Sequence, residues 1–132
     1  ETSPYNVYGL TKLGAECTVR TLSNFCIIRT SFFDPENIEF DTAAVDAYSS
    51  KVPISYLVKA IKIMFDYDFA GVINIGRERR SDYEHYKEFK PEIKKCGLKD
   101  ILKTVPFAMA KDASMDCSLW GKIEKENGTI KK

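Results

Sequence analysis

Tyr8 and Lys12 are the first candidates for chemistry, because a tyrosine and a lysine at this spacing could together transfer a proton. On an α-helix, residues four positions apart lie on the same face, one turn from each other. A lysine ammonium beside a tyrosine favours the phenolate form, so the tyrosine could give a proton to a carbonyl oxygen or take one from an alcohol. Spacing alone does not decide the matter, because Tyr83/Lys87 and Tyr86/Lys90 repeat it, and both pairs fit an ordinary amphipathic helix.

The cysteines and the single histidine form no metal-binding pattern. Cys17, Cys26, Cys96 and Cys117 are far apart in the sequence, without a Cys-x-x-Cys pair, and His85 is close to none of them. We therefore expect no metal site. The cysteines are interpreted as buried free thiols of a reducing compartment, with a disulfide framework as the alternative. His85 has no acidic residue or cysteine at a sequence spacing typical of a catalytic or metal-binding pair, and it is predicted to lie at the surface.

Two further groups of side chains have both a structural and a functional interpretation. Arg77, Arg79 and Arg80 precede a predicted helix, which favours a solvated loop, although they could instead bind a phosphate of a nucleotide sugar. Trp120 has Met115 and other apolar residues nearby, and this grouping favours a packing cluster over a stacking platform.

The pattern of apolar residues predicts the elements that position these side chains. Ser81 and Glu84 form a capping box, which predicts a helix start, and Pro91 stops or restarts that helix. The expected order is a helix, a strand, a long irregular stretch, a helix, a strand and the capped helix, in residues 8–22, 25–28, 29–51, 53–67, 71–76 and from 81 onward. This order is typical of the α/β class. Two strands do not make a stable sheet alone, so further strands lie in the loops or the sheet is completed elsewhere.

Composition and charge limit the classes of function that the chain could have. The chain has 132 residues, which fits one domain, and its 44% hydrophobic content supports a real core. A formal net charge of +1 gives no electrostatic reason to expect binding to nucleic acid or to an anionic membrane. No apolar run approaches the roughly 18–20 residues that span a bilayer, and the first residues do not look like a secretory signal. We expect a cytoplasmic protein.

Residues 3–16, with the sequence SPYNVYGLTKLGAE, closely resemble the active-site helix of extended short-chain dehydrogenase/reductases. Within that group they look most like the dTDP-4-dehydrorhamnose reductase family and its nucleotide-sugar relatives. The similarity continues in the expected order in residues 28–32, 52–57, 71–76 and 112–116. It implies the C-terminal portion of a Rossmann-like NAD(P)-binding domain in residues 1–33, and mainly a small α/β substrate-binding lobe in residues 34–132.

The resemblance also implies a reaction, the reduction of a ketone at C4 of a nucleotide sugar. Tyr8 would pass a proton to the carbonyl oxygen while NADPH or NADH delivers a hydride, and Lys12 would hold the nicotinamide ribose. Ser31 falls where the family's chain passes the nicotinamide, and Phe32 where it passes the substrate. Phe32 fits a core position equally well.

The sequence departs from the family at the dinucleotide phosphates. None of its seven glycines forms the Gly-rich turn that receives the pyrophosphate, and Ser3 is too close to Tyr8 to match the family's upstream Ser/Thr. We therefore expect a C-terminal half that is inactive alone, needs the missing N-terminal half in cis or in trans, and could pair as a homodimer. The alternatives are a nucleotide-sugar 4-epimerase or 4,6-dehydratase, a non-catalytic binding or regulatory protein on the same scaffold, or a piece without a function of its own.

Overall fold

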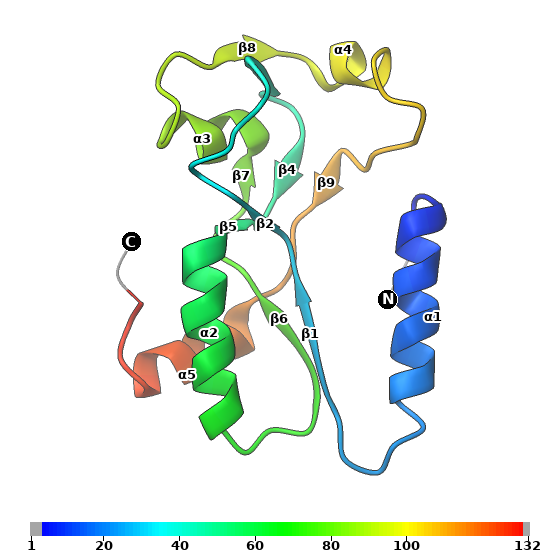
Figure 1. Cartoon of the computed structure of the whole chain (residues 1–132), viewed down its shortest axis with the longest axis vertical. Helices are drawn as coiled ribbons and strands as arrows, with labels where there is room; N and C mark the ends of the chain where they lie inside the picture. The colour runs from blue at the N-terminus through cyan, green and yellow to red at the C-terminus, as the bar shows by residue number, and fades with distance from the viewer. Residues whose placement is uncertain (1–3, 131–132) are drawn as a thin grey trace.

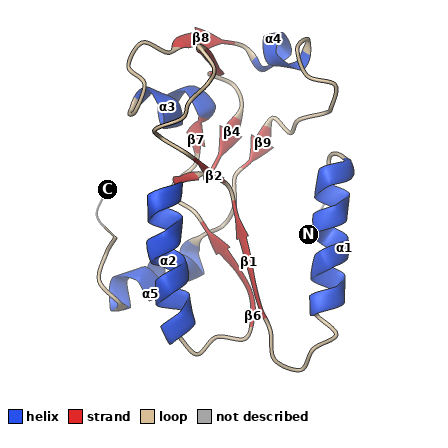
Figure 2. Ribbon diagram, in the orientation of Figure 1, coloured by secondary structure: helices blue, strands red, loops and turns tan. Residues whose placement is uncertain are grey.

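The computed structural model describes residues 4–130, in which short helices and strands alternate along the chain (Figures 1 and 2). Ser3 lies outside the described residues. The helices are α1 (Val7–Val19), α2 (Ile54–Asp66), α3 (Asp82–Lys87), α4 (Leu98–Leu102) and α5 (Ser118–Glu126). The strands are β1 (Cys26–Thr30), β2 (Phe32–Phe33), β3 (Thr42–Ala44), β4 (Tyr48–Ser49), β5 (Val52–Pro53), β6 (Gly71–Ile75), β7 (Arg80–Ser81), β8 (Lys94–Cys96) and β9 (Asp112–Ala113).

The centre of the molecule is a parallel pair of strands, β1 and β6. Cys26 lies opposite Gly71 and Thr30 opposite Ile75, so the two strands pair over their whole length. Helix α2 connects them on one side, while α1 stands on the other side of the pair (Figure 1). The two predicted strands are thus confirmed, and their pairing is parallel.

The long stretch before α2 contains the additional strands that the sequence left open. β2 pairs with β5 and β3 with β8, both in parallel, whereas β4 lies between antiparallel β7 and parallel β9. These strands form separate small sheets. Within residues 4–130 none of them joins β1 and β6, so that sheet has two strands there.

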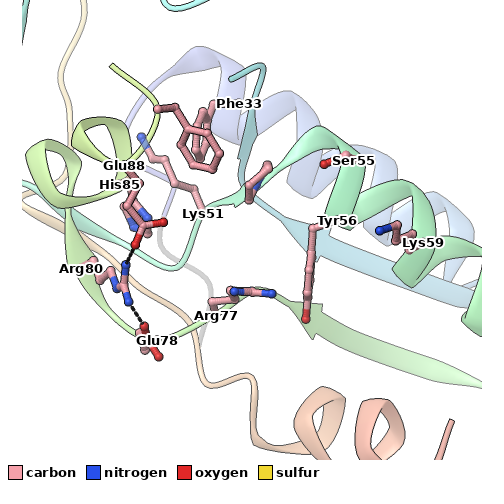
Figure 3. A pocket seen from close by; sticks show the side chains of 12 residues that line it. Phe33, Lys51, Ser55, Tyr56, Lys59, Arg77, Glu78, Arg80, His85 and Glu88 are labelled. Atoms are coloured by element: carbon pink, nitrogen blue, oxygen red, sulfur yellow. Dashed lines mark hydrogen bonds and ion pairs between the residues drawn. The ribbon is translucent and has the colours of Figure 1, made fainter. Parts of the chain in front are cut away.

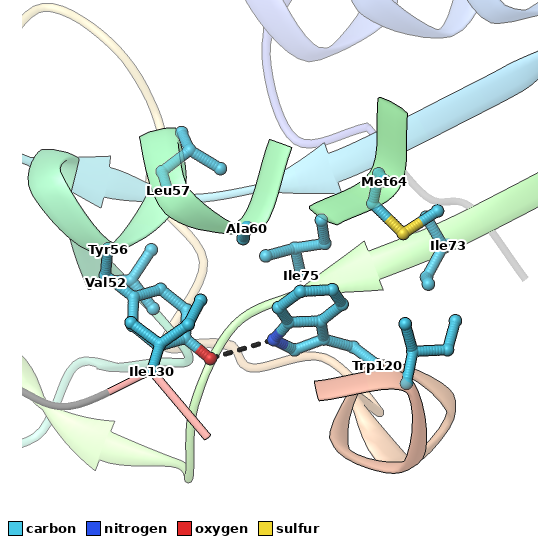
Figure 4. Packing of buried hydrophobic residues seen from close by; sticks show 10 residues of the cluster. Val52, Tyr56, Leu57, Ala60, Met64, Ile73, Ile75, Trp120 and Ile130 are labelled. Atoms are coloured by element: carbon cyan, nitrogen blue, oxygen red, sulfur yellow. Dashed lines mark hydrogen bonds between the residues drawn. The ribbon is translucent and has the colours of Figure 1, made fainter. Parts of the chain in front are cut away.

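The main core lies between α2, β6 and α5. The buried residues of α2 fall on one face of the helix, at Tyr56, Leu57, Ala60 and Met64. They pack with Ile73 and Ile75 of β6 and with Trp120 of α5 (Figure 4). Trp120 is only 1% exposed, and its Nε1 donates to the Tyr56 hydroxyl at 2.8 Å. The prediction that Trp120 belongs to a packing cluster is confirmed.

Gly76 permits a close approach at the end of β6. A Cβ atom at this position would lie 2.5 Å from the Ser50 carbonyl oxygen and 3.0 Å from the Cys117 Sγ. The Arg77 backbone N–H donates to the same carbonyl oxygen at 3.1 Å. Only glycine therefore lets β6 pass this close to the segment before β5.

The predicted capping box is present at the start of α3. The Ser81 hydroxyl accepts from the Glu84 backbone N–H at 3.3 Å, and the Glu84 carboxylate accepts from the Ser81 backbone N–H at 2.8 Å. The hydrogen bonds from Ser81 are the largest cause of the lowered pKa of Glu84. The helix ends at Lys87, ahead of Pro91.

The cysteines differ from the prediction. All four are free, but Cys17 and Cys26 are exposed and Cys96 and Cys117 are half-buried. Cys17 and Cys26 belong to apolar segments whose outer faces no other described residue covers, so an apolar neighbourhood in sequence did not mean burial. In the part of the chain that the structure describes, no helix is long and apolar enough to cross a membrane.

Candidate functional site

The start of α1 presents Tyr8 and Lys12 on one face. Asn6 caps the helix, because its Oδ1 accepts from the Gly9 backbone N–H at 2.9 Å. Lys12 lies one turn beyond Tyr8, and its Nζ is 5.2 Å from the centroid of the Tyr8 ring. Tyr8 is 70% exposed. The predicted side-by-side arrangement is therefore present, on a surface that a substrate can reach.

A cavity of about 680 Å³ adjoins Tyr8. It is lined by residues 5–8 and by residues 106–108 of the segment before β9. Asn6 joins the two walls, because its Nδ2 donates to the Ala108 carbonyl oxygen at 3.1 Å. One side chain thus caps the helix that carries Tyr8 and also fixes the opposite wall, which makes Asn6 a positioning residue that the sequence analysis missed.

The two other Tyr-x-x-x-Lys pairs have different surroundings. Lys87 also lies 5.2 Å from the centroid of the Tyr83 ring, but Tyr83 is half-buried and packs against a core cluster. Tyr86 is buried, and its hydroxyl accepts from Lys51 at 2.8 Å. Lys90 is held by Asp41 and by two backbone carbonyls. Exposure beside a cavity, and not the spacing, distinguishes Tyr8.

Ser31 and Phe32 directly follow the end of β1. Ser31 is half-buried, and its carbonyl oxygen accepts from the Val52 backbone N–H at 2.9 Å. Phe32 is 53% exposed, so its alternative interpretation as a core residue is wrong. Because consecutive strand residues point to opposite faces, the next ring, Phe33, is the one that packs, 5.1 Å from Tyr86 between ring centroids. No hydrogen bond or ring contact joins Ser31 or Phe32 to Tyr8 among residues 4–130.

Arg29 holds α1 against β1. Its Nε and Nη2 donate to the two carboxylate oxygens of Glu16 at 2.7 and 2.6 Å. This hydrogen bonding is the largest cause of the lowered pKa of Glu16. α1 buries none of its side chains completely, so this ion pair and Asn6 are the specific links that place Tyr8. The sequence analysis did not find the pair, since nothing in the linear order of two opposite charges indicates that they meet.

The arginines before α3 have separate roles. Arg79 contacts Asp112 at 2.7 Å and lies 3.6 Å from the centroid of the Tyr48 ring. Hydrogen bonds from Ser114 and then from Arg79 lower the pKa of Asp112 to about 2. The structure thus ties Arg79 to a carboxylate, not to solvent alone.

The other two arginines line a second cavity, of about 300 Å³, together with His85 (Figure 3). Arg80 is held between Glu78 and Glu88, whereas Arg77 lies 4.5 Å from the centroid of the Tyr56 ring.

His85 is buried, which corrects the prediction of a surface residue. It is 6% exposed, and its Nε2 lies 3.1 Å from the Ser49 carbonyl oxygen of β4. Burial lowers the pKa of His85. The ring is buried against β4 at the wall of the second cavity, and this contact with a distant strand is not visible in the sequence around His85. Among the described residues, no three His, Cys, Asp or Glu side chains are grouped closely enough to hold a metal ion.

Comparison with solved structures relates this arrangement to known proteins. A hypothetical dTDP-4-dehydrorhamnose reductase from Sulfolobus tokodaii superposes with a TM-score of 0.76, at 24% identity, over 92% of this chain and 49% of its own. The chain has the fold of about half of such an enzyme. The dTDP-4-dehydrorhamnose reductase of Bacillus anthracis, solved in complex with NADP, gives a TM-score of 0.71 at 16% identity, and covers 98% of this chain and 51% of its own.

A third dTDP-4-dehydrorhamnose reductase, from Yersinia enterocolitica, gives a TM-score of 0.64 at 19% identity, over 89% of this chain and 50% of its own. No family model matches the sequence, and no curated protein sequence matches it significantly. The resemblance read from the Tyr8 segment is thus supported by the fold, a mixed α/β arrangement with small parallel sheets, and the chain spans about half the length of these enzymes.

Proposed function

We propose that the chain carries the proton-transfer pair and the substrate-binding lobe of an NAD(P)H-dependent reductase that acts on a 4-keto nucleotide sugar. The observation that carries this proposal is the exposed Tyr8, with the Lys12 ammonium 5.2 Å from its ring, beside a cavity of about 680 Å³. Two further points support it: the fold is that of half a dTDP-4-dehydrorhamnose reductase, and one of those structures contains NADP.

In this proposal Tyr8 is the proton donor. Its hydroxyl gives a proton to the sugar carbonyl oxygen, and Lys12 stabilises the negative charge left on the ring. The chemistry that NAD(P)H supplies when bound is a hydride to the carbonyl carbon. Phe107 and Pro106 form an apolar wall of the cavity beside Tyr8, and Asn6 holds that wall through its hydrogen bond to the Ala108 carbonyl oxygen.

The residues present here fit the nicotinamide end of the cofactor. Lys12 is exposed, and Thr30 Oγ1 at the end of β1 is a buried hydroxyl oxygen without a hydrogen-bond partner among residues 4–130. Ser31 follows it directly. The dinucleotide phosphates need donors of another kind, a Gly-rich turn before a helix. We therefore propose that residues 1–33, with the strand β6 that pairs with β1, belong to the dinucleotide-binding domain, and that residues 34–132 otherwise form mainly the substrate lobe, with the phosphate-binding half supplied in cis or in trans.

The test is to combine the chain with the polypeptide encoded upstream of it, and to follow oxidation of NADPH and of NADH with dTDP-4-dehydrorhamnose as substrate. Tyr8→Phe removes the proton donor, so we expect a loss of about 100-fold or more in kcat. Tyr83→Phe is the matched control, because the Tyr83 ring lies at the same distance from a lysine ammonium.

Each result has a distinct meaning. A rate that survives Tyr8→Phe would contradict the catalytic role and favour a non-catalytic binding protein. Failure of the combined chains to bind either dinucleotide would contradict the whole proposal. Binding without reduction, but with inversion of the C4 hydroxyl of a nucleotide sugar, would reassign the site to a 4-epimerase, and loss of water from a nucleotide sugar to give a 4-keto-6-deoxy sugar would reassign it to a 4,6-dehydratase.

A further inference from the structure

Two side-chain contacts tie α1 to the rest of the chain by hydrogen bonds in the part that the structure describes. Near the end of the helix, Arg29 binds Glu16. At its start, Asn6 Nδ2 donates to the Ala108 carbonyl oxygen. Tyr8 lies about two helical turns from Glu16 but only two residues from Asn6. The placement of Tyr8 relative to the rest of the chain therefore depends most directly on Asn6.

The segment that contains Ala108 is itself fixed within the lobe proposed to bind the substrate. It runs between α4 and β9 and passes the start of α1 (Figure 1). The Lys111 carbonyl oxygen accepts from the Tyr48 backbone N–H at 2.9 Å, and β9 then pairs with β4. Met109 packs against a buried cluster of Ala44, Ala47 and Leu98. A movement of this lobe is therefore carried to the Ala108 carbonyl oxygen.

Asn6 passes such a movement on to α1 because one planar amide group makes both contacts. Its Oδ1 accepts from the Gly9 backbone N–H at 2.9 Å, while its Nδ2 donates to Ala108 at 3.1 Å. Serine and aspartate cap helices as well as asparagine does, but neither has the amide nitrogen that donates to Ala108. Asparagine is therefore needed here for the link between α1 and the lobe, and not for the cap alone.

The same hydrogen bond joins the two walls of the cavity beside Tyr8. Residues 5–8 form one wall and residues 106–108 the other. A ligand bound between them contacts both walls, so their separation decides how closely the Tyr8 hydroxyl approaches a bound carbonyl oxygen. A general acid has to lie within hydrogen-bond reach of the atom that it protonates, and a misplacement of about 1 Å can cost on the order of 100-fold in rate.

We infer that Asn6 couples the substrate lobe to the proton donor, so that the position of residues 106–108 sets the position of Tyr8. The catalytic meaning of this coupling rests on the proposed function, whereas the coupling itself rests on the contacts of Asn6 alone. A substrate that draws the wall at residues 106–108 toward itself also brings Tyr8 to the carbonyl oxygen. Asn6 transfers no proton and acts through Tyr8, as a positioning residue.

The coupling is measured without substrate, by hydrogen exchange of the full chain in a double-mutant cycle. Met109→Ala removes the side chain that packs the segment into the lobe. We expect the amides of residues 9–12 to exchange about 3–10-fold faster, the effect of weakening one hydrogen bond. Asn6→Ser keeps a cap and should speed the same amides by a similar factor. In the double variant, Met109→Ala should add nothing further, because the link is already absent.

Additive effects of the two substitutions would overturn the coupling. Unchanged exchange of residues 9–12 in Met109→Ala alone would overturn it as well. Asn127→Ser is the matched control, because Asn127 Nδ2 also donates to a backbone carbonyl oxygen, that of Ile123, at 2.9 Å. That bond lies within the last turn of α5, so its loss should leave residues 9–12 unchanged. Asn6→Asp also keeps a cap and should repeat the result of Asn6→Ser.

The catalytic consequence is measured after the chain is combined with the upstream polypeptide, with dTDP-4-dehydrorhamnose as substrate. Asn6→Ser should lower kcat about tenfold and change KM by less than about twofold, because the lobe still binds substrate while the proton donor is misplaced. Asn127→Ser should change neither constant. A raised KM at unchanged kcat would overturn the inference, since Asn6 would then only shape the binding site. If the wild-type combination reduces no sugar, the proposed function fails, and the exchange cycle still decides the coupling.

Discussion

Replacing Glu16 by Gln tests how Tyr8 is held in place. α1 has 13 residues and buries none of them completely, and isolated helices of this length are marginal in water. Its orientation therefore depends on specific links to the body of the protein. Glu16→Gln keeps the shape of the side chain but removes the charge that binds Arg29 through both carboxylate oxygens.

The size of the effect follows from the exposure of the pair. The side chains of Glu16 and Arg29 are 16% and 30% exposed, between a surface pair and a buried one. Fully exposed pairs contribute about 0–1 kcal/mol, and a hydrogen bond to a charged group contributes about 1.5–3 kcal/mol. We expect Glu16→Gln to cost about 1–2 kcal/mol in the docking of α1, a factor of about 5–30 in its local equilibrium.

Native-state hydrogen exchange measures this directly. The amides of residues 7–19 should exchange about 5–30-fold faster in Glu16→Gln, while those of β6 keep their protection. Arg20→Gln is the control, because Arg20 contacts the same carboxylate only at 3.7 Å and is more exposed. Unchanged protection of α1 in Glu16→Gln would refute the view that this pair anchors the helix.

The same pair has a pH signature with a defined sign. Arg29 lowers the pKa of Glu16 below its ordinary value of 4.5. The folded chain therefore favours the ionised form of the Glu16 side chain more than the unfolded chain does. The stabilisation is fully present above pH 4.5 and is lost as the pH falls through the lowered pKa. Acid should therefore loosen α1 in the wild type, and Glu16→Gln should not show that additional loosening.

Two other substitutions test the core. Tyr56→Phe leaves the buried Nε1–H of Trp120 without its acceptor, which costs about 1–3 kcal/mol of the free energy of unfolding. The midpoint of urea unfolding, measured by the fluorescence of the single tryptophan, should therefore fall. An unchanged midpoint would contradict the assigned bond. Burial lowers the pKa of His85 below 6.5, so stability falls as the pH drops from 6.5 through the native pKa, by at most about 1.4 kcal/mol per pH unit. His85→Gln should flatten this part of the profile, and an equally steep slope in the variant would assign it to other groups.

Features encoded by neighbouring residues could be predicted from the sequence. The Ser81–Glu84 capping box and the one-turn spacing of Tyr8 and Lys12 are local, and both are present in the structure. The two apolar strands were also predictable, because continuous apolar runs between helices are typical of parallel sheets.

Features that depend on distant residues could not be predicted. The burial of His85 depends on the Ser49 carbonyl oxygen, and the anchoring of α1 depends on Arg29. The exposure of Cys17 was missed because an apolar helix face was assumed to be covered, whereas the described residues leave it open. Phe32 and Phe33 are adjacent in sequence, and only the strand geometry decides which ring packs in the core.

The pairing of β1 with β6 also has a consequence for synthesis on the ribosome. Cys26 pairs with Gly71, so β1 leaves the exit tunnel well before its neighbour has been translated. At about 5–20 residues per second, β1 waits roughly 2–9 s for β6. During that interval the edge of β1 that later pairs with β6 is open to strand pairing with other nascent chains. Slower translation of the segment between β1 and β6 should therefore lower the yield of correctly folded protein.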